Sequence, residues 1–153
     1  MKSIFETEID IPQAKLAEFY ANPKNNTKWM TDVERYEYLG GIPGRPGSKY
    51  RMMPKKGNMV FVVTIVSNDL PNELSAILES SNVNVLVTGK FIALSPIKTK
   101  FISEQIFTFK GIISKAFGLL AGRAIKKAHY NHMNSFRQVV MAIQNSEEVF
   151  QNV

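Results

Sequence analysis

Apolar residues recur every three or four positions through the last long segment of the chain, residues 111–144. This spacing is typical of an amphipathic α-helix that buries one stripe. The predicted buried stripe consists of Phe117, Leu120, Ala124, Ala128, His132, Phe136, Val139 and Ile143. Because no proline interrupts the segment, we expect one continuous helix about 50 Å long. A helix of that length needs a broad apolar surface beneath it.

The start of the chain shows a different pattern, in which apolar and acidic residues alternate. Residues 3–11 place Phe5, Ile9 and Ile11 on one side and acidic side chains on the other, which predicts a half-buried β-strand. Pro12 suits the first turn of a helix, so we expect a short helix over residues 14–22. A second short helical piece is predicted over residues 25–31.

Further strands are predicted from residue 33 onward, because apolar runs are separated by turn signals. The expected strands cover residues 34–39, 48–53, 58–68, 73–80, 83–94 and 99–109. Residues 58–68 are apolar at nearly every position, which predicts a central strand covered on both faces. The fold class is therefore α+β, with an antiparallel sheet followed by the long helix.

The segment between the second and third predicted strands, residues 40–47, contains four glycines and two prolines. Such a composition is typical of an ordered, turn-rich loop. A phosphate-binding loop needs a helix after it and a Lys-Ser/Thr ending, whereas a strand follows here. We therefore interpret the segment as a structural loop.

This order of elements, with Ile9–Pro12, Trp29 in the second short helix and the 40–47 loop, resembles the START-like (SRPBCC, helix-grip) superfamily. Within it, the sequence is most similar to the polyketide cyclase/dehydrase branch. The resemblance implies a helix-grip fold, in which a curved seven-stranded antiparallel sheet wraps around the C-terminal helix and leaves a deep cavity. Members bind lipids, sterols, polyketides, plant hormones or quinones, and some are cyclases or contact chaperones or ribosomes. The resemblance therefore implies that the protein has a cavity, but it does not indicate a particular reaction.

The predicted cavity walls are the inward residues of the later strands and the helix stripe. The candidate ligand-binding residues are Trp29, Tyr50, Met52, Phe61, Ala76, Leu78, Val87, Phe101, Ser103, Gln105, Phe107, Phe117, Leu120, Ala124, Ala128 and His132. Ala124 and Ala128 are small for a close-packed stripe. Small residues at these positions either bring the helix close to the sheet or leave space for a ligand.

Three polar residues on these predicted inward faces are candidates for orienting a ligand. Gln105 and Ser103 interrupt a strand face of phenylalanines, and a buried amide without a partner costs roughly 1–3 kcal/mol. His132 is interpreted either as a satisfied core histidine or as a polar cavity group that could move protons. His129 lies three residues before it, but a zinc site needs a third ligand, and we expect no metal or other cofactor.

Composition excludes several other classes of function. The chain of 153 residues has the size of one domain, and we expect residues 1–153 to form one. The formal net charge of +6 comes from scattered basic residues, so nucleic-acid binding is not expected. With zero cysteines there is no thiol nucleophile and no thiolate metal site. Without a signal peptide pattern or a transmembrane segment, we expect a cytoplasmic protein.

Three hypotheses for function follow. The first is binding or carriage of a small hydrophobic ligand of the lipid, polyketide or quinone class. The second is a cyclase/dehydratase-type enzyme acting on a polyketide-like substrate, with His132 or Tyr50 moving protons. The third is a protein-interaction module, because Ile112, Ala116 and Leu119 form an apolar second face on the helix. That face could be a cavity lid or the contact of a homodimer.

Overall fold

One antiparallel sheet of seven strands, in the order β1-β7-β6-β5-β4-β3-β2, forms the back of the molecule. The computed structural model describes residues 1–151. Its strands are β1 (Lys2–Ile9), β2 (Val33–Gly40), β3 (Lys49–Pro54), β4 (Phe61–Asp69), β5 (Glu73–Glu79), β6 (Val83–Ser95) and β7 (Lys98–Phe109). Consecutive strands pair as hairpins from β2 to β7, and β1 pairs with β7. The first and last strands therefore lie side by side.

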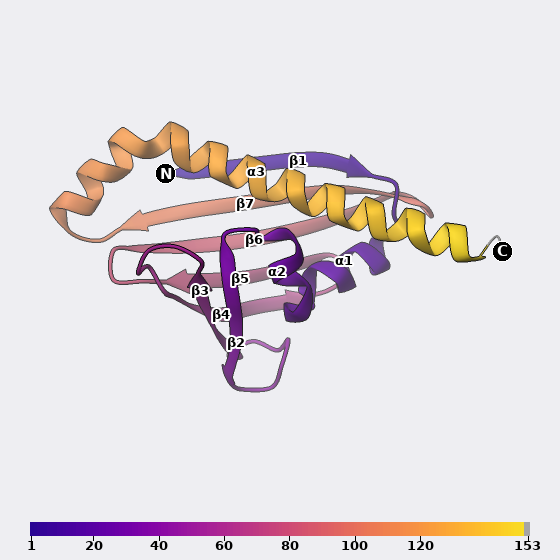
Figure 1. Ribbon diagram of the computed structural model, residues 1–153, viewed down its shortest axis with the longest axis horizontal. Coiled ribbons are helices and arrows are strands. Elements are labelled where there is room, and N and C mark those ends of the chain that lie inside the picture. Colours follow the sequence, from indigo (N-terminus) through magenta and orange to yellow (C-terminus); the bar gives the residue numbers. More distant parts are fainter. Residues whose placement is uncertain (152–153) are drawn as a thin grey trace.

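All of the described helices lie on one face of this sheet (Figure 1). They are α1 (Gln13–Ala21), the 3-10 helix η1 (Pro23–Asn25), α2 (Asn26–Trp29) and α3 (Gly111–Gln151). The long helix α3 crosses the face over β1 and β7, and α1 and α2 pack beside its second half. The prediction of a helix-grip α+β fold is confirmed, including two short helical pieces after the first strand and one long C-terminal helix.

The short helices place Trp29 under α3. Pro12 precedes α1, and its carbonyl accepts the first helical hydrogen bond from the amide of Leu16. Asn22 ends α1, and its side chain accepts a hydrogen bond from the amide of Lys24, which caps η1. The 3-10 helix η1 leads directly into α2 without a linker. As a result, α2 turns back over the sheet and the indole of Trp29 is buried.

Two adjoining apolar clusters form the core on the covered face. The larger cluster joins β1, the short helices and the second half of α3: Phe5, Ile9, Ile11, Leu16, Ala17, Trp29, Phe91, Phe101, Met133, Phe136 and Val140. The smaller cluster lies on β3, β4 and β5: Tyr50, Val63, Ile65 and Leu74. Tyr20 and Leu70 pack against both clusters.

The buried stripe of α3 differs from the predicted one by about one position. Its sheet-facing residues are Gly118, Gly122, Ile125, His129, Met133, Phe136 and Val140, so Phe136 is shared with the prediction. Phe117, Leu120, Ala124 and Ala128 are exposed, and the prediction that they are buried was wrong. The first turns of α3 carry bulky apolar residues around most of the helix, so apolar spacing does not define their buried side. The sheet side is instead made of small and polar residues.

The prediction that β4 is covered on both faces was also wrong. Val63 and Ile65 are buried under the helices, whereas Val66 is 50% exposed on the opposite face. No helix covers that face among the described elements. The apolar residues on the outer side of β4 are consistent with the β-propensity of valine, which suits half-buried strands as well as buried ones.

Candidate functional site

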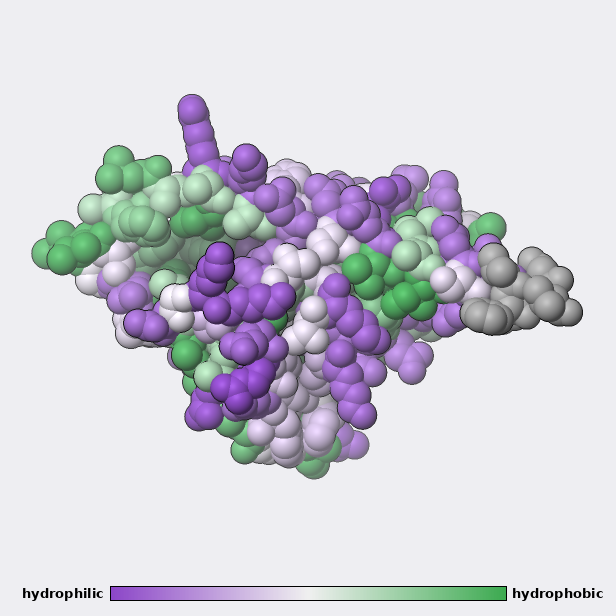
Figure 2. All heavy atoms as spheres, viewed as in Figure 1, coloured by the Kyte–Doolittle hydropathy of each residue, from purple (hydrophilic) through white to green (hydrophobic). Residues whose placement is uncertain are grey.

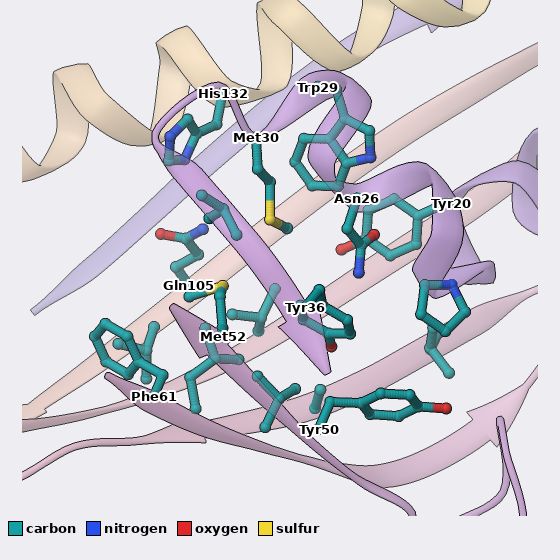
Figure 3. A pocket seen from close by; sticks show the side chains of 18 of the residues that line it. Tyr20, Asn26, Trp29, Met30, Tyr36, Tyr50, Met52, Phe61, Gln105 and His132 are labelled. Carbon is teal, nitrogen blue, oxygen red and sulfur yellow. The ribbon is translucent and has the colours of Figure 1, made fainter. Parts of the chain in front are cut away.

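A cavity of about 330 Å³ lies between the sheet, the middle of α3 and the segment from α1 to β2 (Figure 3). Its floor is apolar and comes from β3 to β7: Met52, Phe61, Val63, Ile65, Leu74, Ala76, Leu78, Val85, Val87 and Phe107. Its roof comes from α2 and α3: Asn26, Trp29, Met30, Ile125, Ala128, His129, His132 and Met133. Asn26 and Met30 point from the helical side toward the sheet.

Most of the sequence-predicted candidates line this cavity. They are Trp29, Tyr50, Met52, Phe61, Ala76, Leu78, Val87, Gln105, Phe107, Ala128 and His132. The strand residues could be placed because side chains alternate between the two faces of a β-strand. Once one residue is known to face inward, every second residue from it is expected to face inward as well. Their role in binding a ligand stays a prediction.

Five other candidates lie outside the cavity lining. Phe101 is fully buried in the larger cluster, with its ring 5.3 Å from Phe91 and 5.1 Å from Phe136. Ser103 is fully buried and bonded to a histidine. The remaining three, Phe117, Leu120 and Ala124, project from the exposed side of α3 because the helix is rotated relative to the prediction.

Several lining residues were missed by the sequence analysis, and the most informative are Tyr20, Asn26, Tyr36 and His129. Tyr20 lies on α1, and nothing in its sequence spacing indicates that it borders a cavity. Its ring approaches β6 so closely that a Cβ at Gly89 would lie 2.9 Å from it. The glycine in this strand therefore makes room for the tyrosine, which is the one local signal of the contact.

The buried histidine of α3 is His129 rather than His132. Its side chain is 2% exposed, and its ring nitrogens contact two serine hydroxyls: Nδ1 lies 2.7 Å from Ser3 Oγ and Nε2 lies 2.9 Å from Ser103 Oγ. Burial, followed by the nearby charge of His132, lowers the pKa of His129 to about 4. At neutral pH the imidazole is therefore uncharged, and one hydroxyl donates to it while the other accepts.

His132 is half-buried at the edge of the cavity and pairs with a carboxylate. Its Nε2 lies 2.8 Å from Asp32 Oδ1, which joins α3 to the turn before β2. Asp32 is the only acidic side chain among the described residues of the lining, and no lysine or arginine is present there. Within the described lining, a carboxylate is therefore present only at the Asp32–His132 pair.

Two tyrosines stack at the far end of the cavity from this pair. The rings of Tyr36 and Tyr50 lie 5.1 Å apart. Burial raises the pKa of Tyr36, with smaller contributions from Tyr50 and Tyr20, and burial raises the pKa of Tyr20 to about 12. The phenols of Tyr20 and Tyr36 are therefore protonated at physiological pH and can donate hydrogen bonds.

Solved structures of other proteins share this architecture at low sequence identity. Norcoclaurine synthase from Thalictrum flavum, in complex with dopamine and hydroxybenzaldehyde, has a TM-score of 0.70 at 13% identity, covering 93% of this chain and 87% of that one. A protein from Thermus thermophilus has a TM-score of 0.72 at 13% identity, covering 94% and 99% of the two chains. A conserved protein from Geobacillus kaustophilus has a TM-score of 0.71 at 12% identity, covering 93% and 96%.

The chain has the START-like (SRPBCC) helix-grip fold. No protein-family model and no curated protein sequence matches it. The assignment to the polyketide cyclase/dehydrase branch therefore stays a prediction, because likeness at this level of identity establishes the fold alone.

Two amides of this helix-grip domain face the cavity without a protein partner. Neither the Gln105 nor the Asn26 side chain hydrogen-bonds to another described residue, although both are at least partly buried. Gln105 extends from β7 toward His132, and Asn26 extends from α2 (Figure 3). The indole nitrogen of Trp29 is also buried without a partner. The two amides give a mainly apolar space places where a ligand oxygen could be held.

Proposed function

We propose that this protein binds or carries a small, mainly apolar ligand in the cavity under α3. The observation that supports the proposal is a mainly apolar cavity in which two of the lining amides, Gln105 and Asn26, have no hydrogen-bond partner among the described residues. The amide atoms of Gln105 and Asn26 are not among the fully buried groups that lack a partner, so they are accessible, and a ligand carbonyl or hydroxyl could bond to them in place of water. Such a mixture of apolar walls and few polar groups is typical of small-molecule sites.

The chemistry of the walls favours a neutral ligand. No lysine or arginine lines the described cavity, so a carboxylate or phosphate would enter without a compensating charge. The phenols of Tyr20 and Tyr36 stay protonated, so they would donate to a carbonyl oxygen. A ligand of the lipid, polyketide or quinone class with carbonyl or hydroxyl groups meets both conditions.

Filling the cavity should weaken binding without unfolding the protein. We expect Ala76→Phe, on the floor of the cavity, to weaken binding of the neutral fluorescent probe 1-aminoanthracene by about tenfold or more, because the phenyl ring occupies the probe's volume. Ala124→Phe is the matched control, since Ala124 is exposed on α3 and should leave binding unchanged. Fluorescence titration and thermal melts of both variants check this. Equal probe affinity in the two variants would show that the probe binds elsewhere.

A second candidate function is proton transfer to or from the bound ligand, as in a cyclase/dehydratase-type enzyme. The Asp32–His132 pair favours it, because a carboxylate that holds an imidazole at a cavity edge is a common arrangement for a general base. We expect His132→Gln to abolish deuterium exchange at the carbon beside a ligand carbonyl, measured by NMR in D₂O, while ligand affinity stays nearly unchanged. If the unaltered protein catalyses no exchange and His132→Gln only lowers ligand affinity, the second candidate function is wrong and the protein is a carrier.

A further inference from the structure

The first turns of α3 expose a concentrated apolar surface. Five bulky residues are between 62% and 89% exposed and form what we call the α3 tip: Ile112, Ile113, Phe117, Leu119 and Leu120. Figure 1 shows this part of α3 extending past the end of β7, and Figure 2 shows its apolar atoms gathered at one end of the molecule. Isolated exposed apolar residues are ordinary, but a contiguous group of five is typical of a contact surface.

The α3 tip is held against the sheet on its other side. A Cβ at Gly118 would lie 2.5 Å from the ring of Phe109, and one at Gly122 would lie 3.4 Å from the sulfur of Met1. The two glycines therefore let the helix sit directly on the end of β7 and the start of the chain. Because the small residues face the sheet, the bulky ones are presented outward on a supported surface.

The charged residues on the α3 tip and flanking it in the sequence are all positive. No acidic residue occurs between Glu104 and Glu147, whereas basic residues surround and follow the tip: Lys110, Lys115, Arg123, Lys126 and Lys127. These five side chains are exposed. None of them forms an ion pair within the described part of the chain. The surface therefore combines apolar residues with uncompensated positive charge.

This combination indicates which partner fits the α3 tip. Two copies of the chain that met tip to tip would bring their basic residues together, which costs electrostatic energy. An anionic lipid surface offers the complementary charge, and its interior accepts the bulky side chains. None of the described helices has the length and hydropathy to cross a bilayer, so the contact would be interfacial.

We propose that the α3 tip docks the protein on the surface of a membrane that contains anionic lipids. The apolar side chains enter the headgroup region, and the lysines and arginine lie against lipid phosphates. The proposal stands independently of the ligand, because none of the five tip residues lines the cavity under α3. The cavity lining begins at Ile125, so docking would hold that end of the cavity near the bilayer.

Vesicle flotation tests this proposal. We expect the protein to float with phosphatidylcholine–phosphatidylglycerol vesicles, and much less with pure phosphatidylcholine vesicles. The double variant Leu119→Gln/Leu120→Gln should bind the anionic vesicles at least about tenfold more weakly, because it removes two apolar side chains that enter the headgroup region when the protein is bound. Lys126→Gln/Lys127→Gln should weaken binding by roughly fivefold per charge. Both pairs are exposed, so melting temperatures should be unchanged.

The control pair is Ile42→Gln/Ile97→Gln, which removes two exposed isoleucines that lie outside α3. It should bind vesicles like the unaltered protein. Equal binding of all variants, or equal binding to neutral and anionic vesicles, would overturn the proposal. Absence of vesicle binding together with a dimer that Leu119→Gln/Leu120→Gln dissociates, seen by sedimentation velocity, would also overturn it and assign the surface to a second copy.

Discussion

We expect Phe136→Ala to lower the free energy of unfolding by about 3–5 kcal/mol, because it empties the centre of the larger apolar cluster. The Phe136 side chain is fully buried. Its ring lies 5.1 Å from Phe101, 5.3 Å from Trp29 and 5.5 Å from Tyr20, so three elements lose contacts when it is truncated. The loss includes both the transfer energy of the ring and the cost of the cavity left behind.

The matched control is Phe117→Ala, the same substitution on the same helix. Phe117 is largely exposed, so we expect a change of about 0.5 kcal/mol or less. Urea unfolding of both variants, followed by circular dichroism, measures the difference. A Phe117→Ala variant as unstable as Phe136→Ala would mean that the buried side of α3 begins where the apolar spacing predicted.

The second large effect is a loss of stability in mild acid, caused by His129. Above pH 6.5 the imidazole is neutral in both the folded and the unfolded chain, and it makes no pH-dependent contribution. As the pH falls, the unfolded chain binds a proton first, because burial lowers the pKa of the folded His129 to about 4. Stability is therefore complete above pH 6.5 and is lost as the pH falls toward 4. We expect a loss of about 2 kcal/mol between pH 7 and pH 5 from this residue.

Urea unfolding at these two pH values tests the assignment. His129→Gln should remove most of the pH-dependent loss, since glutamine can still bond to Ser3 and Ser103 but does not titrate. His132→Gln is the control, because His132 is half-buried and paired with Asp32 at the cavity edge. The assignment fails if His129→Gln keeps the full loss between pH 7 and pH 5 while His132→Gln abolishes it.

Much of the fold could be predicted because the strands obey a simple alternation. Phe5 and Ile9 are both buried in β1. Because side chains alternate between the two faces of a strand, such positions tell which residues of the strand face the core and which face solvent. The same rule placed Met52, Phe61 and Ala76 on the cavity side without any knowledge of the sheet's curvature. The starts of α1 and α3 were predictable from Pro12 and from Gly111, but α3 continues to Gln151, past the predicted end at residue 144.

The rotation of α3 could not be predicted, for a physical reason. Hydrophobic spacing assigns the apolar side of a helix to the core, but the first turns of α3 expose their large side chains and turn Gly118 and Gly122 toward the sheet. A stripe extrapolated from Phe117 consequently selected His132 instead of His129. Glycines that permit close contact leave no hydrophobic signal, so only the three-dimensional packing identifies them.

The polar residues of the candidate site were also only partly predictable. Gln105 is visible from sequence, because it interrupts an apolar strand face. Asn26 is not, since an asparagine in a short helical piece is ordinarily a capping or solvent-exposed residue. Its position in the cavity depends on how η1 and α2 fold back over the sheet, which is a long-range property.

Native mass spectrometry of the protein purified from the cells that produce it tests the central claim most directly. If the cavity binds a small apolar ligand, gentle ionisation should show a population that is heavier than the chain by one molecule. That molecule should extract into organic solvent, and its bound fraction should fall in Ala76→Phe but persist in Ala124→Phe. A protein that carries no extractable molecule, and that binds 1-aminoanthracene equally well in Ala76→Phe and Ala124→Phe, would contradict the account.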